Sequence, residues 1–205
     1  MELQVAWEAH VAHEPAWFES LVALHREPHR RYHTERHVRG VIRHALALGH
    51  HATDLGAVVA AAFFHDAVYD PTAADNEARS ADLARRALAD LGWQADRVAA
   101  VAAMIEATAE HTTDRAADTA SIDTAVLLAA DLGVLAADPA GYAEYVTGVR
   151  SEYGFVSDAD WRSGRGQVLR GLLDRAAIYD IRLGLEAWER RARANLAAEL
   201  TTLAR

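Results

Sequence analysis

The sequence predicts an all-α fold, a single-domain bundle of helices packed around one apolar central helix. Ala and Leu dominate the composition, and only 12 Gly and 4 Pro interrupt the 205 residues, which favours helix. Apolar residues recur at helical spacing, and no segment shows convincing strand alternation. We find no internal repeat or linker, and the length suits one domain with a real hydrophobic core. We therefore predict one domain over residues 1–205.

Periodicity and capping signals predict each helix in turn. The first carries Trp17, Leu21 and Leu24 on one stripe, and a basic connection broken by Pro28 separates it from a second helix that ends near Gly49. The full set of expected helices covers residues 14–24, 33–49, 54–70, 77–91, 96–110, 119–136, 139–153, 158–173 and 178–203. We expect the core of this domain at about 28–136, with the helices of 139–203 packing on it.

The third of these helices is the predicted centre of the bundle. Thr53 or Asp54 can cap its start, and Asp70-Pro71 ends it. Between these points it is apolar nearly all round, and such a helix belongs in the interior. A fourth helix then begins after Asn76, a good N-cap.

Composition excludes several classes of function. A net charge of −9 disfavours binding to a nucleic-acid backbone or a membrane surface, although a local Arg cluster still allows a small phosphorylated ligand. The absence of Cys excludes disulfides, thiolate nucleophiles and Cys-ligated metals, and fits a reducing cytosol. The acidic start of the chain does not resemble a secretory signal, and no run approaches about 18 apolar residues. We expect a cytoplasmic protein, and a homodimer stays open.

Two ionisable residues, His65 and Asp66, stand inside the most apolar predicted helix. Burying a carboxylate without a partner costs several kcal/mol, so something must compensate it. A metal ion would do so, and so would a hydrogen bond between a core His and a neighbouring Asp. Adjacent residues on a helix point about 100° apart, so both can bind one ion only in a special geometry.

Asp131 and His37 are similar anomalies on two other helices. Asp131 lies on an apolar stripe between Leu127 and Val134, where a hydrogen-bonded Asp near a helix end is the alternative. His37 lies one turn before Val41, where a single His is more often a core or surface residue than a ligand. Three such features on inward faces of three helices favour a shared His/His/Asp/Asp site for a hard or borderline divalent cation.

This order of residues resembles the HD superfamily of metal-dependent phosphohydrolases. The matching strings are Arg36-His37-Val38, Phe63-Phe64-His65-Asp66 and Ala130-Asp131-Leu132. Further strings resemble a bacterial subgroup, the predicted HD phosphohydrolases, over about residues 28 to 180. They are Tyr32-His33-Thr34-Glu35-Arg36-His37, Phe64-His65-Asp66-Ala67-Val68-Tyr69-Asp70, Asp75-Asn76-Glu77, Ser80-Ala81, Thr108 with His111, and Arg150 with Glu152-Tyr153.

The resemblance implies an HD-type bundle that holds one divalent metal ion and hydrolyses a small phosphorylated metabolite or nucleotide. The metal ligands would be His37, His65, Asp66 and Asp131, and Mn, Co, Ni, Fe, Zn and Mg are not distinguished. The ion would activate a water that attacks phosphorus, with Asp66 also orienting that water. Glu77, at the start of the fourth helix, is the candidate general acid/base, although helix dipoles alone favour Glu there.

Three residues are candidates for binding substrate. His33 lies one turn from His37 and is either part of a phosphate pocket or support for the ligands. His111 ends the fifth helix, where it could bind phosphate, bind a second metal or simply suit the helix dipole. Arg150 offers bidentate donors to phosphate, although an Arg on an acidic protein is usually a solvated ion-pair partner.

Two other functions stay open. Some HD proteins hold two irons and use oxygen, but their pattern has two further His between the doublet and the last Asp, where this chain has only His111. The second alternative is a non-catalytic module that binds a nucleotide or a metal and regulates another protein.

Overall fold

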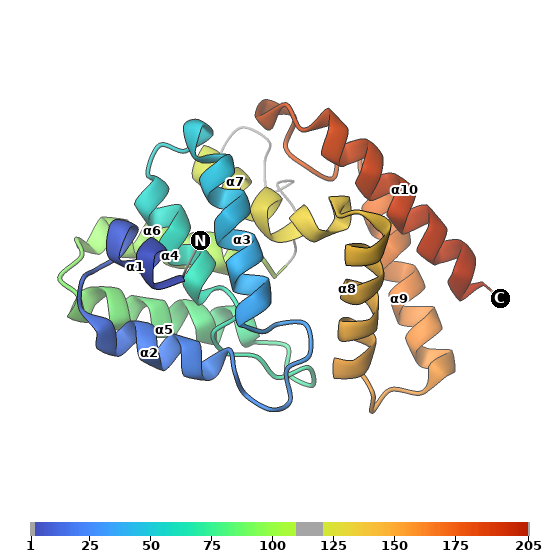
Figure 1. The fold of residues 1–205 in the computed structure, drawn as a ribbon, viewed down its shortest axis with the longest axis horizontal. Helices are drawn as coiled ribbons and strands as arrows, with labels where there is room; N and C mark the ends of the chain where they lie inside the picture. The colour runs from blue at the N-terminus through green and yellow to red at the C-terminus, as the bar shows by residue number, and fades with distance from the viewer. Residues whose placement is uncertain (1–2, 110–120, 205) are drawn as a thin grey trace. The chain divides into compact units, whose positions relative to one another are not determined.

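The structure, a computed structural model, describes residues 3–109 and 121–204, and within these ranges every regular element is a helix (Figure 1). The predicted all-α fold is therefore confirmed. The α-helices are α1 (Leu3–His10), α2 (Pro15–Leu24), α3 (Glu35–Ala47), α4 (Leu55–Phe64), α5 (Asn76–Asp90), α6 (Ala95–Ala107), α7 (Ile122–Asp131), α8 (Pro139–Glu152), α9 (Asp158–Leu173) and α10 (Glu186–Leu203). Short 3-10 helices follow at Gly49–His51, Leu132–Ala136 and Ile181–Leu183. No one of the described helices is long and apolar enough to cross a membrane by itself.

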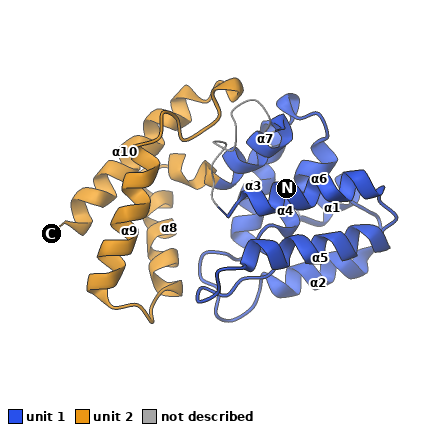
Figure 2. Ribbon diagram, turned by 180° about the vertical axis from the view of Figure 1, so that it is seen from behind, with its two compact units in different colours: residues 1–131 blue, residues 132–205 orange. Residues whose placement is uncertain are grey.

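The chain forms two compact units, residues 1–131 and residues 132–205 (Figure 2). The first contains α1 to α7, and the second contains the 3-10 helix at Leu132–Ala136 and then α8 to α10. The division falls just before the expected boundary between the core and the C-terminal helices. Two expectations stay predictions: that the whole chain is one domain, and that residues 139–203 pack on the core.

Helix α4 is the centre of the first unit, as predicted. It packs against α1, α3, α5, α6 and α7, and every residue from Ala57 to Phe64 is at most 2% exposed. Its start is fixed by Asp54, whose carboxylate accepts the Ala57 N–H at 2.9 Å. Arg97 of α6 binds the same carboxylate through two nitrogens, at 2.6 and 2.8 Å. A helix with this surface is stable only when neighbours cover it on all sides.

The end of α4 differs from the prediction, because the helix stops at Phe64 rather than near Asp70. The His65 N–H still donates to Ala61 O at 2.9 Å, but the carbonyl of Phe63 is bonded by a side chain. That side chain is His25, whose Nε2 lies 3.1 Å from Phe63 O. Contacts from distant residues therefore end the helix, before the chain reaches the local stop signal at Asp70-Pro71.

The sequence analysis missed α1, which has only eight residues. Helices of this length are marginal alone and form through packing. Trp7 supplies that packing, since it is buried and meets Phe63 edge-on with ring centroids 5.2 Å apart. Its ring also lies 6.1 Å from Phe18 of α2. An aromatic cluster thus joins α1 and α2 to the central helix.

Two other boundaries were wrong for identifiable reasons. Asn76 is the first residue of α5 rather than its cap, and its side chain instead pairs with the Asp70 N–H and C=O at 3.0 and 2.8 Å. It thereby closes the loop that leads out of α4. The last helix begins at Glu186 rather than near Ile178, because Gly184 adopts a left-handed φ of 61° that interrupts the helical run.

A buried ion pair joins the three long helices of the second unit. Arg165 of α9 binds Glu199 of α10 through two nitrogens, at 2.8 and 3.0 Å, and both side chains are buried. Tyr142 of α8 donates to the same carboxylate at 2.6 Å, and Arg165 reaches the Tyr145 hydroxyl at 3.0 Å. Every charge here has a partner, as a buried pair requires.

The His25 imidazole is a buried, titratable group in the first unit. It is 2% exposed, and within the described part of the chain its Nδ1 has no hydrogen-bond partner. The pKa of His25 is lowered from 6.5 to about 4, mainly by burial and in part by the positive charge of Arg30. Because the folded state disfavours the protonated ring, stability is present in full above pH 6.5 and is lost as the pH falls toward 4.

We predict that the variant His25→Gln is less sensitive to acid. Glutamine can keep an N–H near Phe63 O, but it does not titrate. Between pH 7 and pH 5, the free energy of unfolding of the unsubstituted chain should fall by about 2 kcal/mol more than that of the variant. Urea titrations at both pH values measure this difference. The exposed His50→Gln variant should behave like the unsubstituted chain, and equal losses in all three proteins would contradict the prediction.

Candidate metal centre

Four side chains of the first unit, those of the residues predicted as metal ligands, converge at one point. His37 comes from α3, His65 and Asp66 directly follow α4, and Asp131 is the last residue of α7. The two Nε2 atoms of His37 and His65 lie 3.0 Å apart. Asp66 Oδ2 lies 3.2 and 3.0 Å from these two atoms, and Asp131 Oδ1 lies 3.2 and 3.6 Å from them. We call this group the His/Asp cluster.

These distances suit a shared metal ion. Ligand atoms of His37, His65 and Asp131 all lie within 4.8 Å of one another. With bonds of about 2.1 Å, neighbouring ligands lie about 3.0 Å apart in an octahedron and about 3.4 Å apart in a tetrahedron. The spacing of the cluster, 3.0 to 3.6 Å, spans these two values. His37, His65 and Asp131 could therefore hold a metal ion, and the Asp66 carboxylate lies close enough to add a fourth ligand.

Helix α3 carries His37 on its buried face. Thr34 caps the helix through Oγ1, which accepts the Arg36 N–H at 3.3 Å. One turn after His37, Val41 is buried on the same face and keeps the helix against its neighbours. Farther along, His44 Nδ1 lies 3.1 Å from Ala130 O, next to Asp131. His44 is partly buried and connects α3 to the end of α7.

The two adjacent ligands lie where α4 ends. His65 is the C-cap of α4 and keeps a helical φ of −55° and ψ of −37°, and Asp66 follows it in a turn. His65 Nε2 and Asp66 Oδ2 lie 3.0 Å apart, so both side chains reach the same point. The residues just beyond are fixed by Ser80 of α5, whose Oγ accepts the Val68 N–H at 3.0 Å and lies 3.3 Å from Val68 O.

A backbone contact sets the tautomer of His65. Its Nδ1 lies 3.0 Å from Ala62 O, and a carbonyl can only accept, so Nδ1 carries the proton. In the neutral ring Nε2 then has its lone pair directed into the cluster. A second hydrogen bond of this kind is usual for metal-binding His residues.

The electrostatics of the cluster favour a cation. Burial alone would lower the pKa of His65, but the Asp66 and Asp131 carboxylates outweigh it and raise that pKa well above its usual value. Burial would likewise raise the pKa of Asp66, but His65 and His33 hold it well below its usual value. Burial would lower the pKa of His37 too, but its hydrogen bonds to the Asp131 and Asp66 carboxylates outweigh burial and raise that pKa. Buried carboxylates thus keep their negative charge and need positive partners.

His33 lies beside the cluster, as expected. Its ring centroid is 5.6 Å from that of His37, and its charge contributes to the lowered pKa of Asp66. It also stacks on Tyr69, at 4.2 Å and 30°. His33 thus lies against the ring of His37 and close enough to Asp66 to influence its carboxylate.

The other candidate residues are less closely connected to the cluster. Glu77 is partly buried in the first turn of α5, and its carboxylate takes part in none of the cluster contacts given above. Arg150 belongs to the second unit, where it binds the carbonyls of Tyr153 and Val156 at 2.7 and 3.2 Å and the carboxylate of Asp158 at 2.7 Å. These contacts hold the turn from α8 to α9, and phosphate binding by Arg150 stays a prediction. His111 lies outside the described residues.

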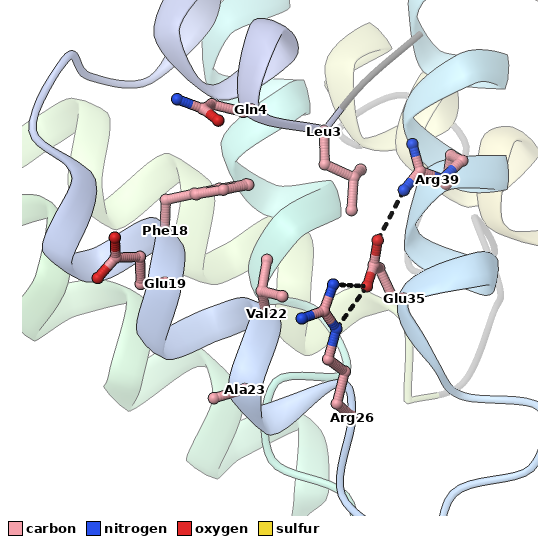
Figure 3. A pocket seen from close by; sticks show the side chains of 9 residues that line it. All are labelled: Leu3, Gln4, Phe18, Glu19, Val22, Ala23, Arg26, Glu35 and Arg39. Atoms are coloured by element: carbon pink, nitrogen blue, oxygen red, sulfur yellow. Dashed lines mark hydrogen bonds and ion pairs between the residues drawn. The ribbon is translucent and has the colours of Figure 1, made fainter.

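The first unit also has a pocket of about 470 Å³ that is distinct from the cluster (Figure 3). Phe18 and Val22 of α2 form part of its wall. On its rim, Glu35 binds Arg26 at 2.7 Å and Arg39 at 2.6 Å. Because none of the four converging residues lines this pocket, it is not the metal centre.

We predict that His65→Ala removes metal from the protein. The substitution deletes a ligand atom from the centre of the cluster. Changes to residues that only orient a metal ligand lower metal affinity by up to about 100-fold, so we expect the loss of a ligand itself to lower it by more. Elemental analysis and titration with Mn²⁺ or Co²⁺ measure the loss, and circular dichroism monitors the fold. His50→Ala removes an exposed His and should keep the metal. Full metal retention by His65→Ala would exclude this centre.

Comparisons with family models, with curated proteins and with solved structures found no match to this chain. The metal centre is therefore supported by its geometry and charge. Three buried side chains could hold a metal ion, with a fourth carboxylate in contact with them.

Proposed function

We propose that this chain is a metal-dependent phosphohydrolase that acts on a small phosphorylated substrate, a nucleotide or a related phosphoester. The observation that carries the proposal is the convergence of His37, His65, Asp66 and Asp131 at distances of 3.0 to 3.6 Å. Two imidazoles and two carboxylates suit a divalent cation of hard or borderline character. The order of these residues also resembles the HD phosphohydrolases.

Such a cation would supply Lewis acidity toward a phosphoryl oxygen and a bound water of lowered pKa. The imidazoles of His37 and His65 and the Asp131 carboxylate would hold this ion. Asp66 would both bind the ion and orient the attacking water.

The exposure of the four side chains indicates where substrate enters. The side chains of His65, His37 and Asp131 are 1%, 5% and 9% exposed, whereas that of Asp66 is 17% exposed. The cluster is therefore closed on three sides and opens beside Asp66. His33 influences this carboxylate and lies at the same side. We propose that His33 contacts the substrate phosphate there.

Glu77 is the proposed general acid/base. It lies three residues before Ser80 on α5, so the two share a helix face. The Ser80 hydroxyl binds the backbone of Val68, two residues after Asp66. The same face of α5 is thus turned toward the loop that carries the doublet, where a carboxylate can pass a proton to a leaving oxygen.

The proposal predicts that Asp66→Ala abolishes turnover. The variant loses the carboxylate that binds the ion and orients water, while the helices around it keep their apolar contacts. Phosphate release from nucleotides and general phosphomonoesters, with added Mn²⁺, Co²⁺, Ni²⁺ or Mg²⁺, measures activity. Asp90→Ala, at an exposed position on α5, is the matched control and should retain activity.

Outcomes of the same panel separate the alternatives. Equal turnover in Asp66→Ala would contradict the mechanism. Two bound irons with oxygen consumption and no phosphate release would identify an oxygenase instead. Tight metal or nucleotide binding without any turnover would indicate a regulatory module.

A further prediction concerns Glu77→Gln, which removes the proton-carrying group without changing size. We expect kcat/KM to fall by about 100- to 10,000-fold, the usual contribution of general acid/base catalysis. The metal content should stay unchanged, because Glu77 is not among the proposed ligands. The exposed Glu19→Gln variant controls for the loss of one surface charge. An unchanged rate in Glu77→Gln would remove this residue from the mechanism.

A further inference from the structure

Arg30 is a fully buried cation beside the His/Asp cluster, and the sequence analysis assigned it no role. Its side chain is 0% exposed. Nη1 donates to the carbonyls of His33 and Asp66 at 3.0 and 2.7 Å, and Nη2 donates to that of Ala67 at 3.0 Å. Nε and Nη2 each lie 3.1 Å from the Glu27 carboxylate. These five contacts match the five N–H donors of a guanidinium.

Three of these contacts connect two segments that carry cluster residues. The His33 carbonyl lies just before α3, which begins at Glu35 and brings His37 to the cluster. The carbonyls of Asp66 and Ala67 lie in the turn that presents the doublet. One of them belongs to a proposed ligand, so Arg30 restrains the backbone of Asp66 itself. Nη1 links the segment before α3 to the turn after α4, because it donates to the His33 and Asp66 carbonyls at the same time.

We propose that Arg30 is a positioning residue for the metal centre, which sets Asp66 at its distance from His37. The inference rests on the metal centre of the proposed function. The two ligands lie on separate segments, His37 in α3 and Asp66 in the turn after α4. Arg30 bridges these segments and so helps to fix the 3.2 Å between His37 Nε2 and Asp66 Oδ2. Because a guanidinium is planar and its donors are fixed relative to one another, it transmits position as well as charge.

A lysine at this position would keep the charge but not the geometry. Its ammonium is a single point with three donors, so it cannot hold His33 O, Asp66 O and Ala67 O while keeping the Glu27 contact. Residues that orient metal ligands typically raise the affinity for the metal by about 10- to 100-fold. We therefore expect Arg30→Lys to raise the Kd for Co²⁺ by about 10- to 100-fold, and to change the visible d–d absorption of bound Co²⁺.

The experiment titrates Co²⁺ into folded protein and records Kd and the absorption spectrum. Arg30→Gln is the second variant, in case the lysine variant does not fold. Glu27→Gln keeps the three carbonyl contacts and should leave Kd within about twofold. Val98→Ala, in the core at α6, should lower Tm without changing the Co²⁺ spectrum, which separates positioning from general stability.

The proposal is overturned if folded Arg30→Lys or Arg30→Gln binds Co²⁺ with the unsubstituted affinity and spectrum. It is also overturned if Glu27→Gln weakens binding as much as Arg30→Lys does, since the ion pair would then be the cause. Phosphate release is measured in parallel. Co²⁺ binding that depends on Arg30 without any phosphate release would contradict only the hydrolase. Phosphate release with an Arg30-independent Kd would contradict only the positioning role.

Discussion

The first unit is organised around one electrostatic constraint, the burial of two carboxylates and two imidazoles at a single point. Removing a carboxylate from water is costly unless a positive partner compensates it. The structure meets this requirement by bringing each carboxylate within 3.2 Å of an imidazole nitrogen. A divalent cation would meet it more completely, because two negative charges face one positive ion. The cluster therefore combines a cost to folding with ligand atoms that could hold a metal ion.

Helix α4 positions two of the four residues of the His/Asp cluster. Neighbouring helices cover it on all sides, so its C-terminal end has one position in the interior. His25 and Arg30 bind the carbonyls at that end and at the turn beyond it. The end of α4 carries His65 and Asp66, and α3 and α7 bring the other two residues to the same place. The packing of the apolar core thus also positions the four polar side chains of the His/Asp cluster.

The sequence predicted the elements whose cause is local. Periodicity identified nine of the helices in the described ranges and the burial of α4, and the high cost of buried charge identified the cluster residues. The end of α4 could not be predicted, because His25 and Arg30 determine it from a distance. Nor could Arg30 be separated from Arg26 and Arg31, since three arginines close together in sequence differ only in where the fold places them.

The direction of α4 has one more consequence. The carbonyl end of a helix carries a partial negative charge of about half an elementary charge, so α4 directs the negative pole of its dipole at the cluster. That field attracts cations and repels anions. In the proposed phosphohydrolase, it would favour binding of the metal ion before an anionic substrate, whose approach the charge of the bound ion would then assist. The orientation of one helix would thus set the order of binding.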